Sequence, residues 1–263
     1  MSAMDVKALD EFVHTLAAQS GQVILPYFRT AMRMDDKGGA YGFDPVTEAD
    51  RAAEKVLRDM IGAAFPDHGI IGEEFDALAG HSDYVWVLDP IDGTKSFVSG
   101  MPAWGTLIGL LKAGAPLYGM MHQPFIGESF YGDSTKAHYR GPAGARALQT
   151  RACARLEDAV LFTTSPRLMN EADRVIFSTV EDQVRLSRYG GDCYAYCMLA
   201  AGQVDLVIET ELKLHDIAAL IPIIEGAGGV ITTWEGESPA KGGRIVAAGS
   251  RAVHEQALKM LKV

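Results

Sequence analysis

The sequence predicts a layered α/β fold, and three patterns carry this prediction. Apolar residues at helical spacing predict helices over residues 5–29 and 48–65. Short apolar runs joined by Gly and Pro turns predict an antiparallel meander between residues 106 and 132. Beyond about residue 155, strand patterns alternate with helix patterns, which is typical of a layered α/β architecture.

The first half combines the two helices with the meander. Pro26 predicts a kink near the end of the first helix, and Pro66 ends the second helix, which Thr47 precedes. A polar, glycine-rich loop is expected between the helices, over 33–44. Strands are expected over 69–72, 84–88, 106–111, 116–122 and 128–132.

The second half begins after a basic, loop-like stretch, residues 140–155, which predicts a domain boundary. We therefore expect one domain over 1–145 and another over 146–263. Strands are predicted over 159–164, 184–190 and 204–210, with helices over 172–184 and around 192–201. A last long helix is expected to open at Asp216 and to end at Gly228-Gly229.

Composition narrows the classes of function. The 263 residues are enough for one or two domains with a buried core. A formal net charge of -10 argues against a nucleic-acid binder, but a bound divalent cation would still allow a small anionic substrate. Three cysteines without a CxxC motif favour neither a disulfide framework nor a zinc ribbon. Because a signal-peptide pattern and a long apolar run are missing, we expect a cytoplasmic enzyme without membrane contact.

Three acidic clusters follow predicted strands, where open α/β sheets usually place their sites. They are Glu73-Glu74, the segment from Asp89 to Asp92, and Asp216. Taken singly, each has an ordinary explanation, because D-P and D-G dipeptides form turns and Asp216 suits a helix N-cap.

Together the clusters predict a metal site. Asp89 and Asp92 flank a Pro turn that can aim both carboxylates and one carbonyl at a single point. Mg²⁺ prefers such oxygen ligands, and two ions can hold the attacking and leaving oxygens of a phosphoryl transfer. Gly93 and Thr94 are expected to begin a helix, so their backbone N–H groups can receive a phosphate.

The ordered segments VTEAD, GEE, WVLDPIDGT and HDIAALIPIIEGAGG resemble the motifs of the inositol monophosphatase superfamily. The resemblance runs from about residue 40 to residue 235 and implies a helix–sheet–helix–sheet–helix sandwich. It also implies a phosphatase that needs two or three Mg²⁺ ions and is usually a homodimer.

Carried over residue by residue, the resemblance implies two metal positions. Glu73, Asp89 and the Ile91 carbonyl are expected to hold the first ion. Asp89, Asp92 and Asp216 are expected to hold the second.

The resemblance also implies roles around these ligands. Thr94 and Asp50 match the pair that orients the attacking water, so the nucleophile is water-derived and not a side chain. Glu74 is expected behind the ligands, and Lys37 lies in the loop that often covers the site in relatives. His215 stands where the family commonly has Trp or Tyr. We expect it to replace that residue in packing, with a hydrogen bond, and a further metal ligand is the alternative.

The segment RYGGDCYAY bears on the substrate, because inositol-type members tend to have a small neutral stretch there. This chain has Asp192 instead, and Glu209 matches the family's substrate-facing acid. Two carboxylates beside one pocket repel each other unless a cation lies between them, and histidinol phosphate carries an ammonium and an imidazole. Asp192 is alternatively a cap for the helix that follows it. Arg188 is expected to approach the phosphate, stack on the imidazole or form a local salt bridge.

The full set of expected substrate contacts joins the metal side of the pocket to this segment. It comprises Asp92, Gly93, Thr94, Arg188, Gly191, Asp192, Glu209 and Asp216. The segments at 92–111 and 119–132 also resemble the histidinol-phosphatase branch of the superfamily.

The leading interpretation is a Mg²⁺-dependent phosphomonoesterase that converts L-histidinol phosphate to L-histidinol in histidine biosynthesis. The alternative is an inositol-1-monophosphatase or a broad-specificity phosphatase with the same mechanism. A non-catalytic metal- or phosphate-binding protein would be expected to lack some of the matched ligands, and all are present. The GTKS segment at 93–96 lacks the glycine spacing of a P-loop, which excludes an NTPase of that type.

Overall fold

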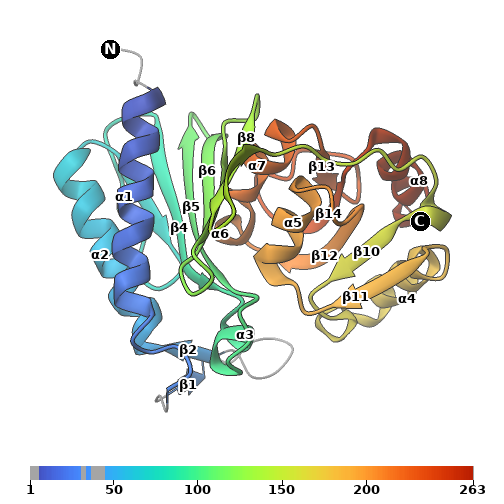
Figure 1. Ribbon diagram of the computed structural model, residues 1–263, viewed down its shortest axis with the longest axis horizontal. Helices are drawn as coiled ribbons and strands as arrows, with labels where there is room; N and C mark the ends of the chain where they lie inside the picture. Colours follow the sequence, from blue (N-terminus) through green and yellow to red (C-terminus); the bar gives the residue numbers. More distant parts are fainter. Residues whose placement is uncertain (1–5, 31–33, 37–44, 263) are drawn as a thin grey trace.

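The chain folds into five alternating layers of helix and sheet (Figure 1). The computed structural model describes residues 6–30, 34–36 and 45–262. Helices α1 (Val6–Ile24) and α2 (Glu48–Ala64) cover one face of a seven-stranded sheet. Helices α5 (Asp192–Ala200), α6 (Leu214–Ile217) and α7 (Leu220–Gly226) lie between this sheet and a five-stranded sheet, and α4 (Glu171–Glu181) and α8 (Arg251–Leu261) cover the far face. This architecture confirms the predicted fold class.

The seven-stranded sheet contains the predicted meander. Its order is β3-β4-β5-β6-β7-β8-β9, with β3 parallel to β4 and all later neighbours antiparallel. The strands are β3 (Gly69–Gly72), β4 (Tyr84–Asp92), β5 (Gly105–Lys112), β6 (Ala115–Gln123), β7 (Glu128–Gly132), β8 (Ala137–Gly141) and β9 (Gly144–Ala147). The short helix α3 (Thr94–Val98) follows β4, and a separate ribbon pairs β1 (Met34–Asp36) with β2 (Pro45–Thr47).

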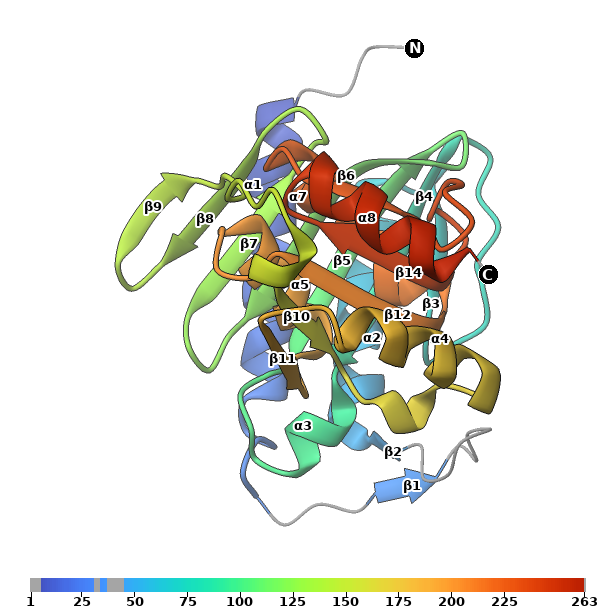
Figure 2. The same cartoon turned by 90° about the vertical axis from the view of Figure 1, so that its right-hand side faces the viewer.

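Three details of this half differ from the sequence prediction. Helix α1 ends at Ile24, so Pro26 follows the helix instead of kinking it, as expected for a residue that cannot donate a backbone hydrogen bond. Strand β4 runs on to Asp92, four residues beyond the predicted end. The predicted loop from 140 includes the end of β8 and all of β9, which extend from the sheet edge (Figure 2).

The five-stranded sheet has the order β11-β10-β12-β14-β13. Its parallel strands are β10 (Val160–Thr163), β11 (Leu186–Tyr189) and β12 (Leu206–Leu212), and β14 (Gly243–Ala248) runs antiparallel to both β12 and β13 (Val230–Thr233). Single turns of 3₁₀-helix cover Leu156–Asp158 and Pro166–Leu168.

The prediction of one last long helix that begins at Asp216 is wrong in two respects. The helix is broken into α6 and α7, and α8 follows it as the last helix. Pro222 explains the break, because its ring would clash with the carbonyl of Ala218 in a continuous helix.

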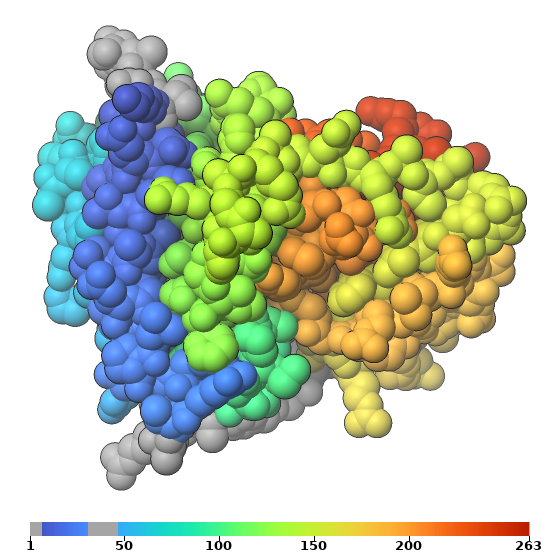
Figure 3. Space-filling view, viewed as in Figure 1, coloured from blue at the N-terminus to red at the C-terminus, as the bar shows by residue number. Residues whose placement is uncertain are grey.

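The two halves share one core. Buried side chains of α5 and α7 pack between Leu107, Met121 and Phe130 of the first sheet and Val207 and Ile245 of the second. The halves form one continuous surface in the space-filling view (Figure 3). The proposed division of the chain near residue 145 stays a prediction. None of the helices in the described ranges is long and apolar enough to cross a bilayer.

Glycine lets the link between α6 and α7 lie directly against the first sheet. A Cβ placed on Gly119 of β6 would come within 1.9 Å of the Ala219 carbonyl oxygen. On the neighbouring strand β5, Gly109 also faces Ala218 and Ala219. These contacts fix the position of α6, and therefore of Asp216.

We predict that Gly119→Ala lowers the free energy of unfolding by about 1–3 kcal/mol, because backbone must move to admit the methyl group. Gly62→Ala is the matched control, since Gly62 is exposed on α2 and a methyl group there would meet nothing within 4 Å. The control should gain roughly 0.5–1 kcal/mol from the restricted unfolded chain. Urea unfolding of both variants measures the difference, and equal stabilities would contradict the close approach.

Candidate active site

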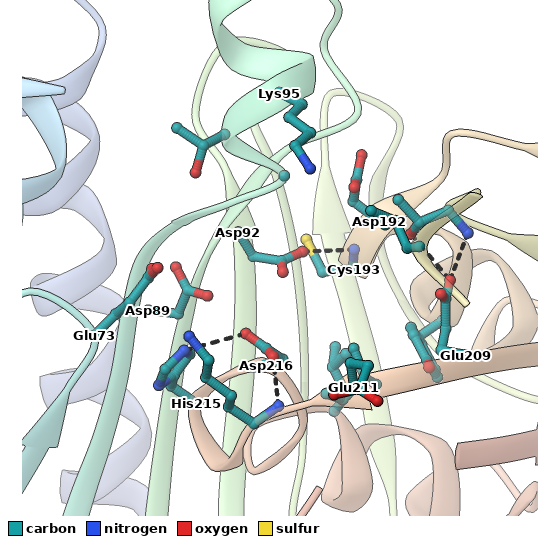
Figure 4. A pocket seen from close by; sticks show the side chains of 18 of the residues that line it. Glu73, Asp89, Asp92, Lys95, Asp192, Cys193, Glu209, Glu211, His215 and Asp216 are labelled. Carbon is teal, nitrogen blue, oxygen red and sulfur yellow. Dashed lines mark hydrogen bonds and ion pairs between the residues drawn. The ribbon is translucent and has the colours of Figure 1, made fainter. Parts of the chain in front are cut away.

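A cavity of about 250 Å³ opens at the junction of the two sheets (Figure 4). It receives side chains from the ends of β3, β4 and β12 and from the starts of α3, α5 and α6. Of the residues predicted for the site, nine line the cavity: Glu73, Asp89, Ile91, Asp92, Gly93, Thr94, Asp192, Glu209 and Asp216.

The end of β4 carries two of the acidic residues on an irregular stretch of strand. The register against β5 shifts between Asp89 and Asp92, so Pro90 and Ile91 form a bulge instead of the predicted turn. The bulge is anchored on both sides, because the Thr106 hydroxyl donates to the Pro90 carbonyl and the Thr94 hydroxyl donates to the Ile91 carbonyl, at 2.8 and 3.1 Å. Both carboxylates consequently face the cavity.

Asp89 lies at the centre of two overlapping groups of possible ligands. Single ligand atoms of Asp89, Asp92 and Asp216 lie within 4.8 Å of one another, and so do atoms of Glu73, Asp89 and His215. Asp89 is 2% exposed, and its Oδ1 has no hydrogen-bond partner among residues 6–30, 34–36 and 45–262. A buried carboxylate oxygen without a donor fits a bound cation.

Electrostatics supports the same conclusion. Burial, reinforced by the neighbouring carboxylates of Glu73, Asp92 and Asp216, raises the pKa of Asp89 well above its usual range. Burial and the charges of Asp192 and Asp216 raise the pKa of Asp92 in the same way. Divalent cations would relieve this repulsion, so the donor set fits the Mg²⁺ ions that the family resemblance implies.

Backbone donors orient two of these carboxylates. Asp92 Oδ2 accepts a hydrogen bond from the Cys193 N–H at 2.6 Å, and Asp216 Oδ2 accepts one from the Lys213 N–H at 2.6 Å. Asp216 is therefore the third residue of α6 and not the N-cap that its sequence position suggested. The bond to Cys193 also ties the end of β4 to the first turn of α5.

Glu73 and Asp50 are positioned by helix α2. Buried Glu54 accepts the Glu74 N–H at 2.8 Å and pairs with Arg58 at 2.7 Å, which holds the turn that carries Glu73. Glu54 was missed from the sequence, although its spacing of four residues from Asp50 placed it on the same helix face. A Cβ on Gly72 would overlap the Glu54 carboxylate, so only glycine permits this packing.

The expected pairing of Thr94 with Asp50 stays a prediction. Asp50 Oδ2 accepts hydrogen bonds from the Thr47 N–H and hydroxyl at 2.8 and 2.6 Å, and Asp50 does not line the cavity. Its charge nevertheless contributes to the raised pKa of Asp89, after burial and the larger effects of Glu73, Asp92 and Asp216. Lys37 lies outside the described residues.

Asp192 and Glu209 lie on the side of the cavity away from Glu73 (Figure 4). Asp192 does not cap α5, because it is the first residue of that helix and its Oδ2 accepts from the Ser96 hydroxyl at 2.7 Å. Its φ of 43° is unusual for a non-glycine residue. Gly93, with a φ of 81°, allows the close approach, since a Cβ there would lie 3.0 Å from the Asp192 Cβ.

Glu209 is buried on β12. Its Oε1 accepts the Thr164 N–H and hydroxyl at 2.6 and 2.9 Å, and its Oε2 accepts the Thr163 hydroxyl at 3.3 Å. Burial raises the pKa of Glu209 to about 8, although the bonds from Thr164 favour the charged form.

Two predicted substrate residues lie elsewhere. Arg188 is exposed on β11 and does not line the cavity. Gly191 is buried against Phe162 and Ala195, where a Cβ would clash, so it has a packing role at the start of α5.

Four further cavity residues have roles that the sequence left open or did not reveal. Lys95 and Lys213 bring positive charge, and Glu211 brings a further carboxylate with a φ of 61°. Glu211 lies where the register between β12 and β14 shifts, and such a bulge leaves no clear sequence signal. His215 faces the cavity with its Nε2 3.4 Å from Asp216 Oδ1, and the expected hydrogen bond to its ring is not found among the described residues.

Comparison with known proteins identifies relatives of this chain. Residues 5–262 match the inositol monophosphatase family. The chain is 44% identical to the bifunctional phosphatase IMPL2, chloroplastic, of Arabidopsis thaliana over 97% of its own length and 76% of that protein. It is 32% identical to a histidinol-phosphatase of Chlorobaculum parvum, with 90% of each chain covered.

A solved structure of an inositol monophosphatase from Zymomonas mobilis superposes with a TM-score of 0.87 at 36% identity, covering 98% of this chain and 100% of that one. The motifs, the layered fold and the acidic cavity thus have the same explanation. The chain belongs to the inositol monophosphatase family, whose members are in general Mg²⁺-dependent phosphatases.

Proposed function

We propose that this chain hydrolyses L-histidinol phosphate to L-histidinol and phosphate, with Mg²⁺ as its cofactor. The observation that carries the choice of substrate is the surplus of carboxylates in the cavity. Beyond the four acidic residues that group as ligands, the cavity is lined by Asp192, Glu209 and Glu211. Lys95 and Lys213 also line the cavity, and a cation beside Glu209 would favour its charged form over the neutral form that burial promotes.

A substrate that brings its own positive charge fits this surplus. Histidinol carries an ammonium and an ionisable imidazole, whereas inositol is a neutral polyol. Burial raises the pKa of Asp192, and a cation beside it would favour the charged carboxylate. Relatives named as histidinol-phosphatases, at 32–35% identity, support the same choice.

On the metal side, Glu73, Asp89 and the Ile91 carbonyl would hold one ion, and Asp89, Asp92 and Asp216 would hold another. Bound Mg²⁺ would supply the positive charge that lowers the pKa of a water and stabilises the leaving oxygen. The backbone at Gly93 and Thr94, at the start of α3, would receive the phosphate.

The reaction exchanges one P–O bond for another. A water oxygen attacks phosphorus and loses a proton, while the bond to the histidinol oxygen breaks and that oxygen gains a proton. Thr94 and Asp50 would orient the water. We also propose that the chain forms a homodimer, because the family resemblance implies one.

The metal assignment predicts opposite effects of Asp92→Asn on stability and on metal response. Without metal, the variant should unfold at a higher temperature, because one of several crowded charges is gone while the amide oxygen still accepts the Cys193 N–H. Mg²⁺ at one hundred times its Kd should stabilise the native chain by about 2.7 kcal/mol and the variant much less.

Thermal unfolding in EDTA and in Mg²⁺ measures both effects. Asp59→Asn is the control, since Asp59 is exposed and pairs with Lys55 on the surface of α2. The control should respond to Mg²⁺ like the native chain. An Asp92→Asn variant that Mg²⁺ stabilises as strongly as the native chain would refute the assignment.

The substrate assignment predicts a strong preference in phosphate release. With Mg²⁺, histidinol phosphate should be hydrolysed far faster than inositol 1-phosphate or adenosine 3′,5′-bisphosphate, and EDTA should abolish release. Equal or faster release from inositol 1-phosphate would favour an inositol monophosphatase or a broad-specificity phosphatase. Metal-independent release, or none from any ester, would contradict catalysis by this centre.

Asp192→Asn tests the cationic pocket directly. The variant keeps an acceptor for the Ser96 hydroxyl and tolerates the positive φ, so it removes mainly charge. We expect kcat/KM for histidinol phosphate to fall about tenfold to hundredfold, the value of one charged hydrogen bond. Turnover of inositol 1-phosphate should stay near its native level, and Asp59→Asn should change neither. Equal losses on both esters would show that Asp192 does not select for charge.

A further inference from the structure

We propose that His215 supplies a nitrogen ligand to the metal centre, on the side of Glu73 and Asp89. The centre would then combine oxygen and nitrogen donors and bind Mn²⁺ more tightly than an all-oxygen site would. The inference rests on the metal centre of the proposed function, and it concerns a position where the sequence departs from the family pattern.

The possible ligand atoms of His215, Glu73 and Asp89 lie close together. One ring nitrogen of His215, one carboxylate oxygen of Glu73 and one of Asp89 lie within 4.8 Å of one another. In an octahedral centre with bonds of about 2.1 Å, adjacent ligands lie about 3 Å apart and opposite ligands about 4.2 Å. Small side-chain adjustments therefore bring the three atoms onto one ion.

The acidic cluster also contains a buried carboxylate oxygen that lacks a hydrogen-bond partner in the described part of the chain. Asp89 Oδ1 is buried without a donor among the residues described, and Asp89 belongs to the group that includes His215. The carboxylate that carries this oxygen therefore lies close enough to the imidazole for one ion to join the two groups. Figure 4 shows Glu73, Asp89 and His215 together on one side of the cavity.

The position of His215 on α6 also keeps its ring beside the metal centre. The His215 side chain is 12% exposed and lies one residue before Asp216 on α6, so both residues reach the same centre. The distance of 3.4 Å from Nε2 to Asp216 Oδ1 is longer than a good hydrogen bond. It suits ligands of two neighbouring ions better than a hydrogen-bond donor and its acceptor.

An imidazole ligand changes which metal ions the centre prefers. Mg²⁺ prefers oxygen ligands, whereas imidazole nitrogen is a good ligand for first-row transition-metal ions. Mn²⁺ accepts the same carboxylate and carbonyl oxygens as Mg²⁺ and, as a transition-metal ion, gains more than Mg²⁺ from a nitrogen donor. A tryptophan or tyrosine ring at this position offers no imidazole nitrogen. His215 would therefore shift the metal preference of this chain away from that of relatives with an aromatic residue.

Pulsed electron paramagnetic resonance of the Mn²⁺-loaded full chain tests the bond directly. The carboxylates and the Ile91 carbonyl offer only oxygen, so a directly bound imidazole should give a ¹⁴N coupling. The coupling should change to that of ¹⁵N when the chain is made with ¹⁵N-labelled histidine. This measurement needs no substitution and remains decisive if a variant fails to fold.

Calorimetric titration of Mn²⁺ and Mg²⁺ supplies the second readout. Because loss of even an outer partner of a ligand costs about 10–100-fold in metal affinity, His215→Phe should weaken Mn²⁺ binding at least about tenfold. Mg²⁺ binding should change by less than about threefold, since Mg²⁺ gains little from nitrogen. His81→Phe is the control, because His81 is exposed and does not line the cavity.

The outcomes separate this inference from the proposed function. Mn²⁺ binding without a histidine nitrogen coupling would overturn the inference and leave the phosphatase proposal intact. An equal loss of Mn²⁺ and Mg²⁺ affinity in His215→Phe would show that the ring supports the carboxylates without binding metal. A native chain that binds neither ion would contradict the proposed function itself.

Discussion

Mutual repulsion among the carboxylates around Asp89 is the constraint that the rest of the structure must satisfy. The chain brings these groups together from separate segments, at the ends of β3 and β4 and at the start of α6. Much of the restraint comes from backbone N–H groups, which hold Asp50, Asp92 and Asp216. Among the carboxylates of this group in the described part of the chain, that of Asp89 has a buried oxygen without a hydrogen-bond partner.

The layered architecture explains how such a cluster is held in place. Hydrophobic clusters under α1 and α2, on both sides of the middle helices, and under α4 and α8 surround the site with rigid elements. The break between α6 and α7 lets a short helix present Asp216 toward β4, while α7 stays packed on the first sheet. Glycine residues allow neighbouring backbone segments to pack in direct contact. This close packing keeps the charged residues from moving apart.

The fold class and the acidic cavity were predictable from the sequence because both depend on local signals. The sequence itself marks strand ends, glycine and proline positions and adjacent acidic residues. These local signals are enough to predict a site that contains Glu73, Asp89, Asp92 and Asp216. Edge strand β9, whose residues are all exposed, was missed because it lacks an apolar pattern.

Other features depend on tertiary packing and could not be predicted. Arg188 is exposed and outside the cavity because β11 pairs at the edge of the five-stranded sheet. Glu211 lines the cavity at the point where the register between β12 and β14 shifts. An acidic residue at the start of a helix can either cap the helix or bind a ligand. The hydrogen-bond donors that face it in the folded chain decide between these two roles. For α5, the carboxylate that meets the first turn belongs to Asp92, about one hundred residues earlier in the chain.

That bond has a consequence for how the site can change over evolution. The donor that steadies Asp92 is a peptide N–H, so its presence does not depend on the side chain at position 193, unless that residue is proline. Side chains in the first turn of α5 can therefore be exchanged to suit another leaving group while the metal ligand stays in place. The chain separates the part of the pocket that can diversify from the part that performs the chemistry.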